Sequence, residues 1–148
     1  MRETIDLTYH AHIEQQSDGY IVTFRDFENI FTEGDSIEEA LANAQEALDG
    51  VLAEMAKGDY DIPMPSAPRL NEYPLPVSPN VAAPILLHML RNKCSKSMVE
   101  IARLMQVPYQ QYQRLEHNCN MTLKSLKRAA AVMGGRVEIK LYIDSAKN

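Results

Sequence analysis

A proline-rich connection divides this chain into two parts whose apolar residues repeat with different periods. Residues 58–79 hold six of the eight prolines, and proline both lacks a backbone N–H and clashes with a preceding helical turn. This stretch can therefore form extended chain or an edge strand, but not a helix. Apolar residues alternate before it and recur every three or four residues after it. The pattern predicts an α+β fold, with a small antiparallel sheet and one helix in residues 1–78 and a helical domain in residues 79–148.

The first part predicts four strands. Residues 5–13 alternate apolar and polar side chains, Asp18-Gly19 supplies a turn, and residues 20–24 return antiparallel. Residues 30–33 predict a third strand. In residues 73–77 the apolar Tyr73, Leu75 and Val77 alternate with two prolines. This segment would add a fourth strand, which can lie only at a sheet edge.

One helix is expected between these strands. Ser36 and Glu39 form the S-x-x-E pattern of a capping box at its start, and Gly58 is a suitable stop. Apolar residues from Ile37 to Met55 recur at three- and four-residue spacing, as on a helix with one buried face.

The second part predicts four helices. Pro84 is expected in or near the first turn of the first helix, Ser95 or Ser97 caps the second, and Gly134-Gly135 ends the fourth. The helices are expected at residues 81–92, at residues 98–105, from Pro108 onward with Tyr112 and Leu115 inside, and near Thr122–Met133.

A final strand, over residues 137–143, is predicted to mediate dimerisation. It has no neighbouring strand in a helical domain, and buried backbone N–H and C=O groups must pair. We expect it to pair antiparallel with the same strand of a second subunit across a twofold axis. The alternative is that it returns to the sheet of its own chain. Its apolar residues are Val137, Ile139, Leu141 and Ile143.

The two parts carry opposite charge. Residues 1–78 contain 4 Lys+Arg against 16 Asp+Glu, a net charge of −12, and residues 79–148 contain 11 against 4, a net charge of +7. The basic part suits a polyanion, most simply nucleic acid. The acidic part would repel nucleic acid and attract a basic protein surface, so two kinds of partner are expected.

No membrane span, metal or cofactor is expected. The apolar run of residues 81–87 is too short for a span, and no apolar core of a signal peptide follows Met1. The two cysteines, Cys94 and Cys119, lack CxxC spacing, which fits reduced thiols in a cytoplasmic protein and gives no zinc site.

Residues 97–116 resemble the helix-turn-helix of phage-repressor-type DNA-binding domains. Ile101-Ala102 supplies the apolar pair of the first helix, Val107 plugs the turn, and Tyr112 and Leu115 anchor the second helix. Glutamine reads adenine in the major groove, and arginine reads guanine or phosphate. The residues expected to face DNA are Tyr109, Gln110, Gln113 and Arg114, with Lys124 and Lys127 of the next helix on phosphates.

The turn of this motif usually holds a glycine where this chain has Gln106. A residue other than glycine at positive φ is uncommon. Two shapes are open: Gln106 at positive φ, or a turn that is longer or of another form.

The first part resembles the N-terminal domain of HicB antitoxins. The resemblance lies in Gly19–Phe24, Asp26, the segment Phe31–Leu41 and the Pro63-Pro65-Ser66 pattern, and it departs from the family at Arg25 and Glu28, which leaves the shape of this loop open. It implies a partial ribonuclease H-like fold and a protein that neutralises HicA, a small basic ribonuclease toxin, and represses its own operon. Acidic residues before the helix are the expected toxin contacts: Asp26, Glu28, Glu33 and Asp35.

Two other functions have to be considered for a chain with this pattern. An enzyme would need Asp6, Asp26 and Asp35 to meet as metal ligands, but nothing in their spacing brings them together, so no catalytic residue and no metal is predicted. A free-standing helix-turn-helix regulator with a ligand-sensing first domain is the alternative function.

Overall fold

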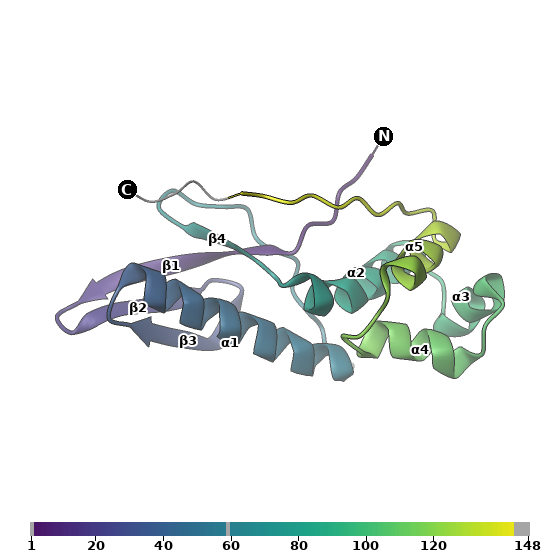
Figure 1. The fold of residues 1–148 in the computed structure, drawn as a ribbon, viewed down its shortest axis with the longest axis horizontal. Helices are drawn as coiled ribbons and strands as arrows, with labels where there is room; N and C mark the ends of the chain where they lie inside the picture. Colours follow the sequence, from purple (N-terminus) through teal and green to yellow (C-terminus); the bar gives the residue numbers. More distant parts are fainter. Residues whose placement is uncertain (1, 59, 144–148) are drawn as a thin grey trace.

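The computed structural model of the protein describes residues 2–58 and 60–143, and it has the expected α+β architecture. A four-stranded antiparallel sheet is covered on one face by a long helix, and four further helices follow (Figure 1). The sheet order is β3-β2-β1-β4. The strands are β1 (Thr8–Gln16), β2 (Gly19–Phe24), β3 (Phe27–Gly34) and β4 (Tyr73–Pro76). The helices are α1 (Ile37–Lys57), α2 (Pro79–Lys93), α3 (Met98–Met105), α4 (Tyr109–His117) and α5 (Leu123–Val132).

The predicted hairpin and edge strand are confirmed, with shifted strand boundaries. β1 begins at Thr8 rather than Ile5, and β3 begins at Phe27, so it is longer than expected. The turn requires Gly19, whose φ is +142° and whose added Cβ would lie 2.6 Å from the carbonyl oxygen of Gly34. β4 pairs with β1 at the sheet edge, where proline is tolerated.

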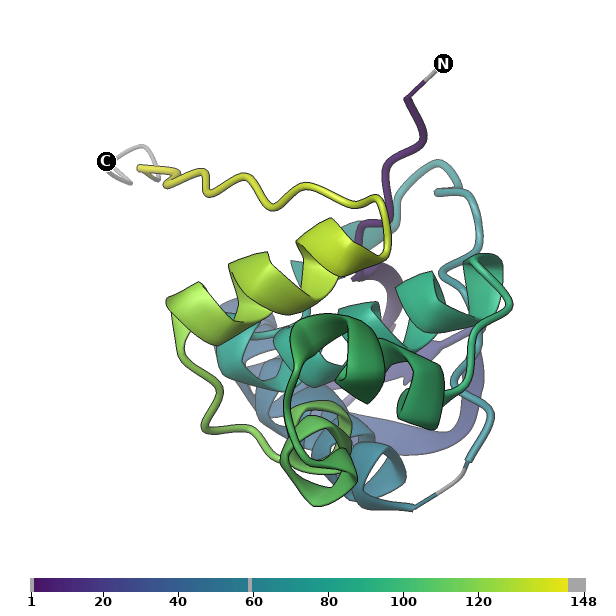
Figure 2. The same cartoon turned by 90° about the vertical axis from the view of Figure 1, so that its right-hand side faces the viewer.

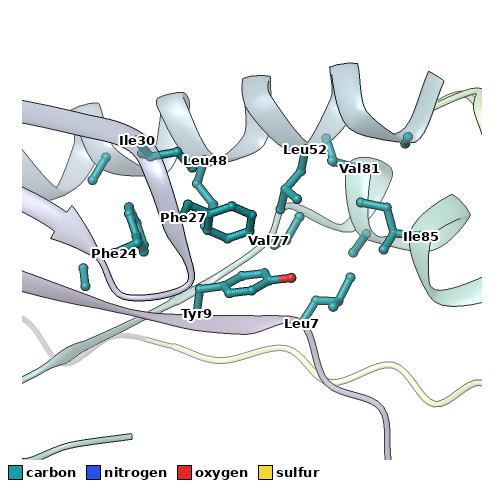
Figure 3. Close-up of a cluster of buried hydrophobic side chains, with 14 of the residues drawn as sticks. Leu7, Tyr9, Phe24, Phe27, Ile30, Leu48, Leu52, Val77, Val81 and Ile85 are labelled. Atoms are coloured by element: carbon teal, nitrogen blue, oxygen red, sulfur yellow. The ribbon is translucent and has the colours of Figure 1, made fainter. Parts of the chain in front are cut away.

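The first core lies between the sheet and α1 (Figure 3). The ring centroids of Tyr9 and Phe27 are 4.8 Å apart in an edge-to-face arrangement. Leu48 and Leu52 of α1 are fully buried in this core. The Tyr9 hydroxyl donates to the carbonyl of Pro63 at 2.7 Å, which ties the proline-rich connection to the core.

Helix α2 belongs to two cores. Val81, Ile85 and Met89 pack into the core of the sheet and α1, whereas Leu87 packs into a second core built by α3, α4 and α5. One helix therefore contacts both parts of the molecule. A division of the chain at residue 78 stays a prediction.

The expected position of Pro84 was wrong, because α2 begins earlier than predicted. Pro79 occupies the first turn, where the missing N–H would lack a helical partner anyway. Pro84 lies inside the helix and removes the bond that an N–H there would donate to the carbonyl of Asn80.

The helical part follows the predicted pattern closely. Ser97 and Glu100 form a complete capping box at the start of α3, and Thr122 caps α5. Gln106 adopts the left-handed conformation, with φ 59° and ψ 45°. The first of the two turn shapes is therefore the observed one.

The predicted final strand is extended chain that joins no sheet within the described residues (Figure 1). Its side chains from Ile139 to Ile143 are exposed, and Leu141 is 93% exposed. It does not return to the sheet of its own chain in the part that the structure describes, and pairing with a second subunit stays a prediction. No helix among the described residues is long and apolar enough to span a membrane.

Candidate nucleic-acid interface and acidic surface

Helices α3 and α4 are joined by the tight turn of a helix-turn-helix. The Val107 amide donates to the Ala102 carbonyl at 3.0 Å, and Gln106 closes the last turn of α3. Ile101 and Tyr112 are fully buried. The small Ala102 is also buried, so the two helices can approach closely at this point.

The outer face of α4 presents most of the predicted DNA-binding side chains. Tyr109, Gln110 and Arg114 are exposed, and so is the unpredicted Gln111. Gln113 is only half-buried, because its position lies nearer the edge of the packed face. Lys124 and Lys127 are exposed on α5. The face is rich in side chains that suit base edges and phosphates.

A buried carboxylate fixes α4 against α2. Glu116 is 2% exposed, and it accepts hydrogen bonds from Arg91 Nε at 2.6 Å and Nη2 at 3.1 Å. His88 Nδ1 lies 3.0 Å from the same carboxylate. Burial opposes ionisation of Glu116, but the hydrogen bonds from Arg91 and its neighbours outweigh burial and hold its pKa below the ordinary value. Glu116 was not predicted; the available signal was its place four residues after Tyr112 on the buried side of α4.

The acidic surface follows strand β3 and the turn before α1. Glu28, Glu33 and Asp35, three of the four predicted toxin contacts, are exposed there. Phe31, which was not predicted, is 61% exposed on the same strand. Residues two apart on a strand share a face, so Phe31 and Glu33 lie side by side. The surface therefore combines an aromatic side chain with a carboxylate.

Asp26, the fourth predicted acid, differs from the other three. It is half-buried, and its carboxylate accepts hydrogen bonds from the backbone N–H of Ser66, at 2.9 Å, and from the Ser66 hydroxyl. The fold itself uses this carboxylate to hold the proline-rich connection against the loop between β2 and β3.

Arg25 strengthens the same attachment. It makes a bidentate ion pair with Glu72, with both N···O distances 2.8 Å, and donates to the Ala67 carbonyl at 2.7 Å. The Glu72 side chain is 5% exposed. The hydrogen bonds from Arg25 lower the pKa of Glu72 to about 2. Arg25, where the chain departs from the family pattern, thus holds the proline-rich connection in place. Spacing along the sequence did not reveal this contact.

No group of three or more His, Cys, Asp or Glu side chains able to hold a metal occurs among the described residues. Asp26 is engaged with Ser66, whereas Asp6 and Asp35 are exposed.

Comparison with known proteins points in one direction. Residues 8–86 match the family model described as "HicB_like antitoxin of bacterial toxin-antitoxin system". The chain is 30% identical over 135 residues to a protein named Antitoxin HicB 2 of Photorhabdus laumondii, covering 90% of this chain and 96% of the relative. It is also 35% identical over 57 residues to an uncharacterised 14.9 kDa protein of Haemophilus phage HP1, covering 38% of this chain and 43% of the relative.

Proposed function

The chain belongs to the HicB-like family of antitoxins of bacterial toxin-antitoxin systems, and on that premise we propose that it neutralises a small basic HicA-type mRNA-cleaving toxin and represses its own operon by binding operator DNA. The observation that carries the proposal is the division of charge, −12 on residues 1–78 and +7 on residues 79–148. A ribonuclease needs a positive surface for phosphates, and an acidic partner can be steered to it and cover it.

The acidic surface of β3 is the proposed toxin-binding site. Exposed Glu28, Glu33 and Asp35 supply the charge that speeds encounter. Phe31 supplies the apolar contact area that an acidic rim by itself lacks, since aromatic side chains, phenylalanine included, are enriched at protein interfaces.

The outer face of α4 is the proposed operator-binding site. Gln110 and Gln113 would contact base edges, with Tyr109 and Arg114 near bases or backbone. Lys124 and Lys127 would bind phosphates. Pairing of residues 137–143 across a twofold axis would present two such helices about 34–36 Å apart, which suits a palindromic site.

Toxin neutralisation is tested with the full chain and the small basic protein expected to be encoded by an adjacent gene. The two should co-purify stoichiometrically, and a triple charge reversal, Glu28→Lys, Glu33→Lys and Asp35→Lys, should slow association much more at low salt than at high salt. Glu46→Lys, on the exposed side of α1, is the control of equal charge change per site. Unaltered association of the triple variant would contradict the assignment of this surface as the toxin-binding site. If no basic partner co-purifies, the free-standing regulator is favoured instead.

A further inference from the structure

The last turns of α1 lie against the C-terminal end of α4, at the junction of the acidic and basic parts (Figures 1 and 2). An open groove runs along this junction. Its polar lining comes from Lys57 of α1, from Arg114 and His117 of α4, and from Asn118 and Asn120 of the following loop. The groove therefore joins the proposed recognition helix to the N-terminal domain.

The lining of the groove is suited to an anion. Lys57 and Arg114 bring two long cationic side chains to it, and Asn118 and Asn120 bring amide groups. The backbone N–H of Asn120 donates to Asn118 Oδ1 at 3.0 Å, which orients the Asn118 amide within the loop. Arginine, lysine and asparagine are among the side chains that most often donate to phosphate oxygens of DNA.

Lys57 is available for such a contact. Its side chain is 62% exposed, and its ion-pair partner Glu54, at 3.0 Å, is 75% exposed. Surface ion pairs of this kind contribute little to stability, so a phosphate can replace the Glu54 carboxylate at little cost in free energy. Lys57 is also the only lysine before Lys93 in a segment crowded with acids. The net charge of the first part would repel DNA, but Lys57, which lines the groove together with residues of α4, is a cation.

We propose that this junction groove binds the phosphate backbone of operator DNA, with Lys57 as a DNA contact supplied by the antitoxin's N-terminal domain. The inference rests on the proposed operator binding by α4. In homeodomains, which are a helix-turn-helix variant, the start of the recognition helix reads the major groove and its far, C-terminal end contacts the DNA backbone. That far end carries Arg114, and Lys57 lines the same groove. The acidic domain thereby takes part in operator recognition and is not merely tethered to the DNA-binding part.

The test measures affinity of the full chain for the DNA upstream of its own gene, by fluorescence anisotropy over a range of salt concentrations. Lys57→Ala should weaken binding roughly three- to tenfold and reduce the slope of log K against log salt by about 0.9, the value for one lost phosphate contact. Lys57→Arg should restore both. Lys93→Ala is the matched control, because Lys93 also sits at a helix end in a surface ion pair, with Glu3, but does not line the groove.

The outcomes separate this inference from the function on which it rests. If Lys57→Ala and Lys93→Ala have the same slope while the Gln110→Ala/Gln113→Ala double variant loses operator preference, the groove contact is overturned and operator binding by α4 stands. If the unaltered chain binds operator and unrelated DNA equally, or the double variant retains full preference, the proposed recognition helix is overturned and the groove contact falls with it. Toxin binding should be unchanged in Lys57→Ala, which excludes a folding defect.

Discussion

Replacing Arg91 with methionine should destabilise the protein and loosen the proposed recognition helix. Methionine keeps much of the side-chain volume but leaves the buried Glu116 carboxylate without its two charged hydrogen bonds, at 2.6 and 3.1 Å. Removing one partner of a buried ion pair costs about 3–5 kcal/mol. The low end, about 3 kcal/mol, is expected here because His88 Nδ1 remains 3.0 Å from the carboxylate.

The loss of free energy of unfolding in Arg91→Met should depend on pH in one direction. In the unaltered protein the pKa of Glu116 is lowered, so its ion pair stabilises the fold above the ordinary carboxyl pKa and this contribution is lost as the pH falls through the folded value. In Arg91→Met burial dominates and raises the pKa of Glu116, so the penalty is greatest at neutral pH and vanishes once the carboxyl is protonated. The difference in free energy of unfolding between the two proteins should therefore shrink as the pH is lowered from 7 toward 4.

Urea unfolding followed by circular dichroism measures this difference, and operator binding measured in parallel reports on α4. Glu116→Gln is the companion variant. This change removes the buried charge, and Arg91, which is slightly exposed, can still be hydrated. Glu116→Gln should therefore lower the free energy of unfolding less than Arg91→Met does. A loss under 1 kcal/mol for Arg91→Met at pH 7, or a loss independent of pH, would refute the reasoning.

Three further predictions follow from single features. Arg25→Ala should let the Glu72 pKa rise from about 2 toward its ordinary 4.5. The difference in free energy of unfolding between the two proteins should therefore be full above pH 4.5 and shrink as the pH falls toward 2. A difference that does not change with pH would contradict this. Gln106→Gly should raise the free energy of unfolding by about 0.5–1 kcal/mol, because glycine relieves the left-handed strain at φ 59° at a smaller entropic cost. Deletion of residues 137–148 should give a monomer with poor operator affinity, by light scattering and anisotropy, whereas a truncated dimer that still binds tightly would exclude strand pairing.

The elements that the sequence predicted well are those with short-range causes. The Asp18-Gly19 turn, the helix N-caps Ser36 and Ser97 and the alternation of β1 each involve residues within a few positions of one another. The helix-turn-helix could be placed because Ile101, Ala102 and Tyr112 occupy helical positions that must be buried together. The charge division likewise needs no fold to be seen, and it indicated two kinds of partner before any residue had a position.

Other features depended on contacts between distant segments, which no local pattern encodes. Arg25 meets Glu72 across 47 positions and Asp26 meets Ser66 across 40, so both pairs exist only once the connection has folded back on the sheet. In the sequence, Glu116 looks like an ordinary exposed acid of a helix. Only the packing of α2 against α4 buries it beside Arg91. Lys57 reads as a cation in the last turn of α1, a favourable place for any lysine. Only the packing of α1 against α4 brings it into the lining of the same groove as Arg114, because tertiary contacts decide which of many exposed charges share a surface.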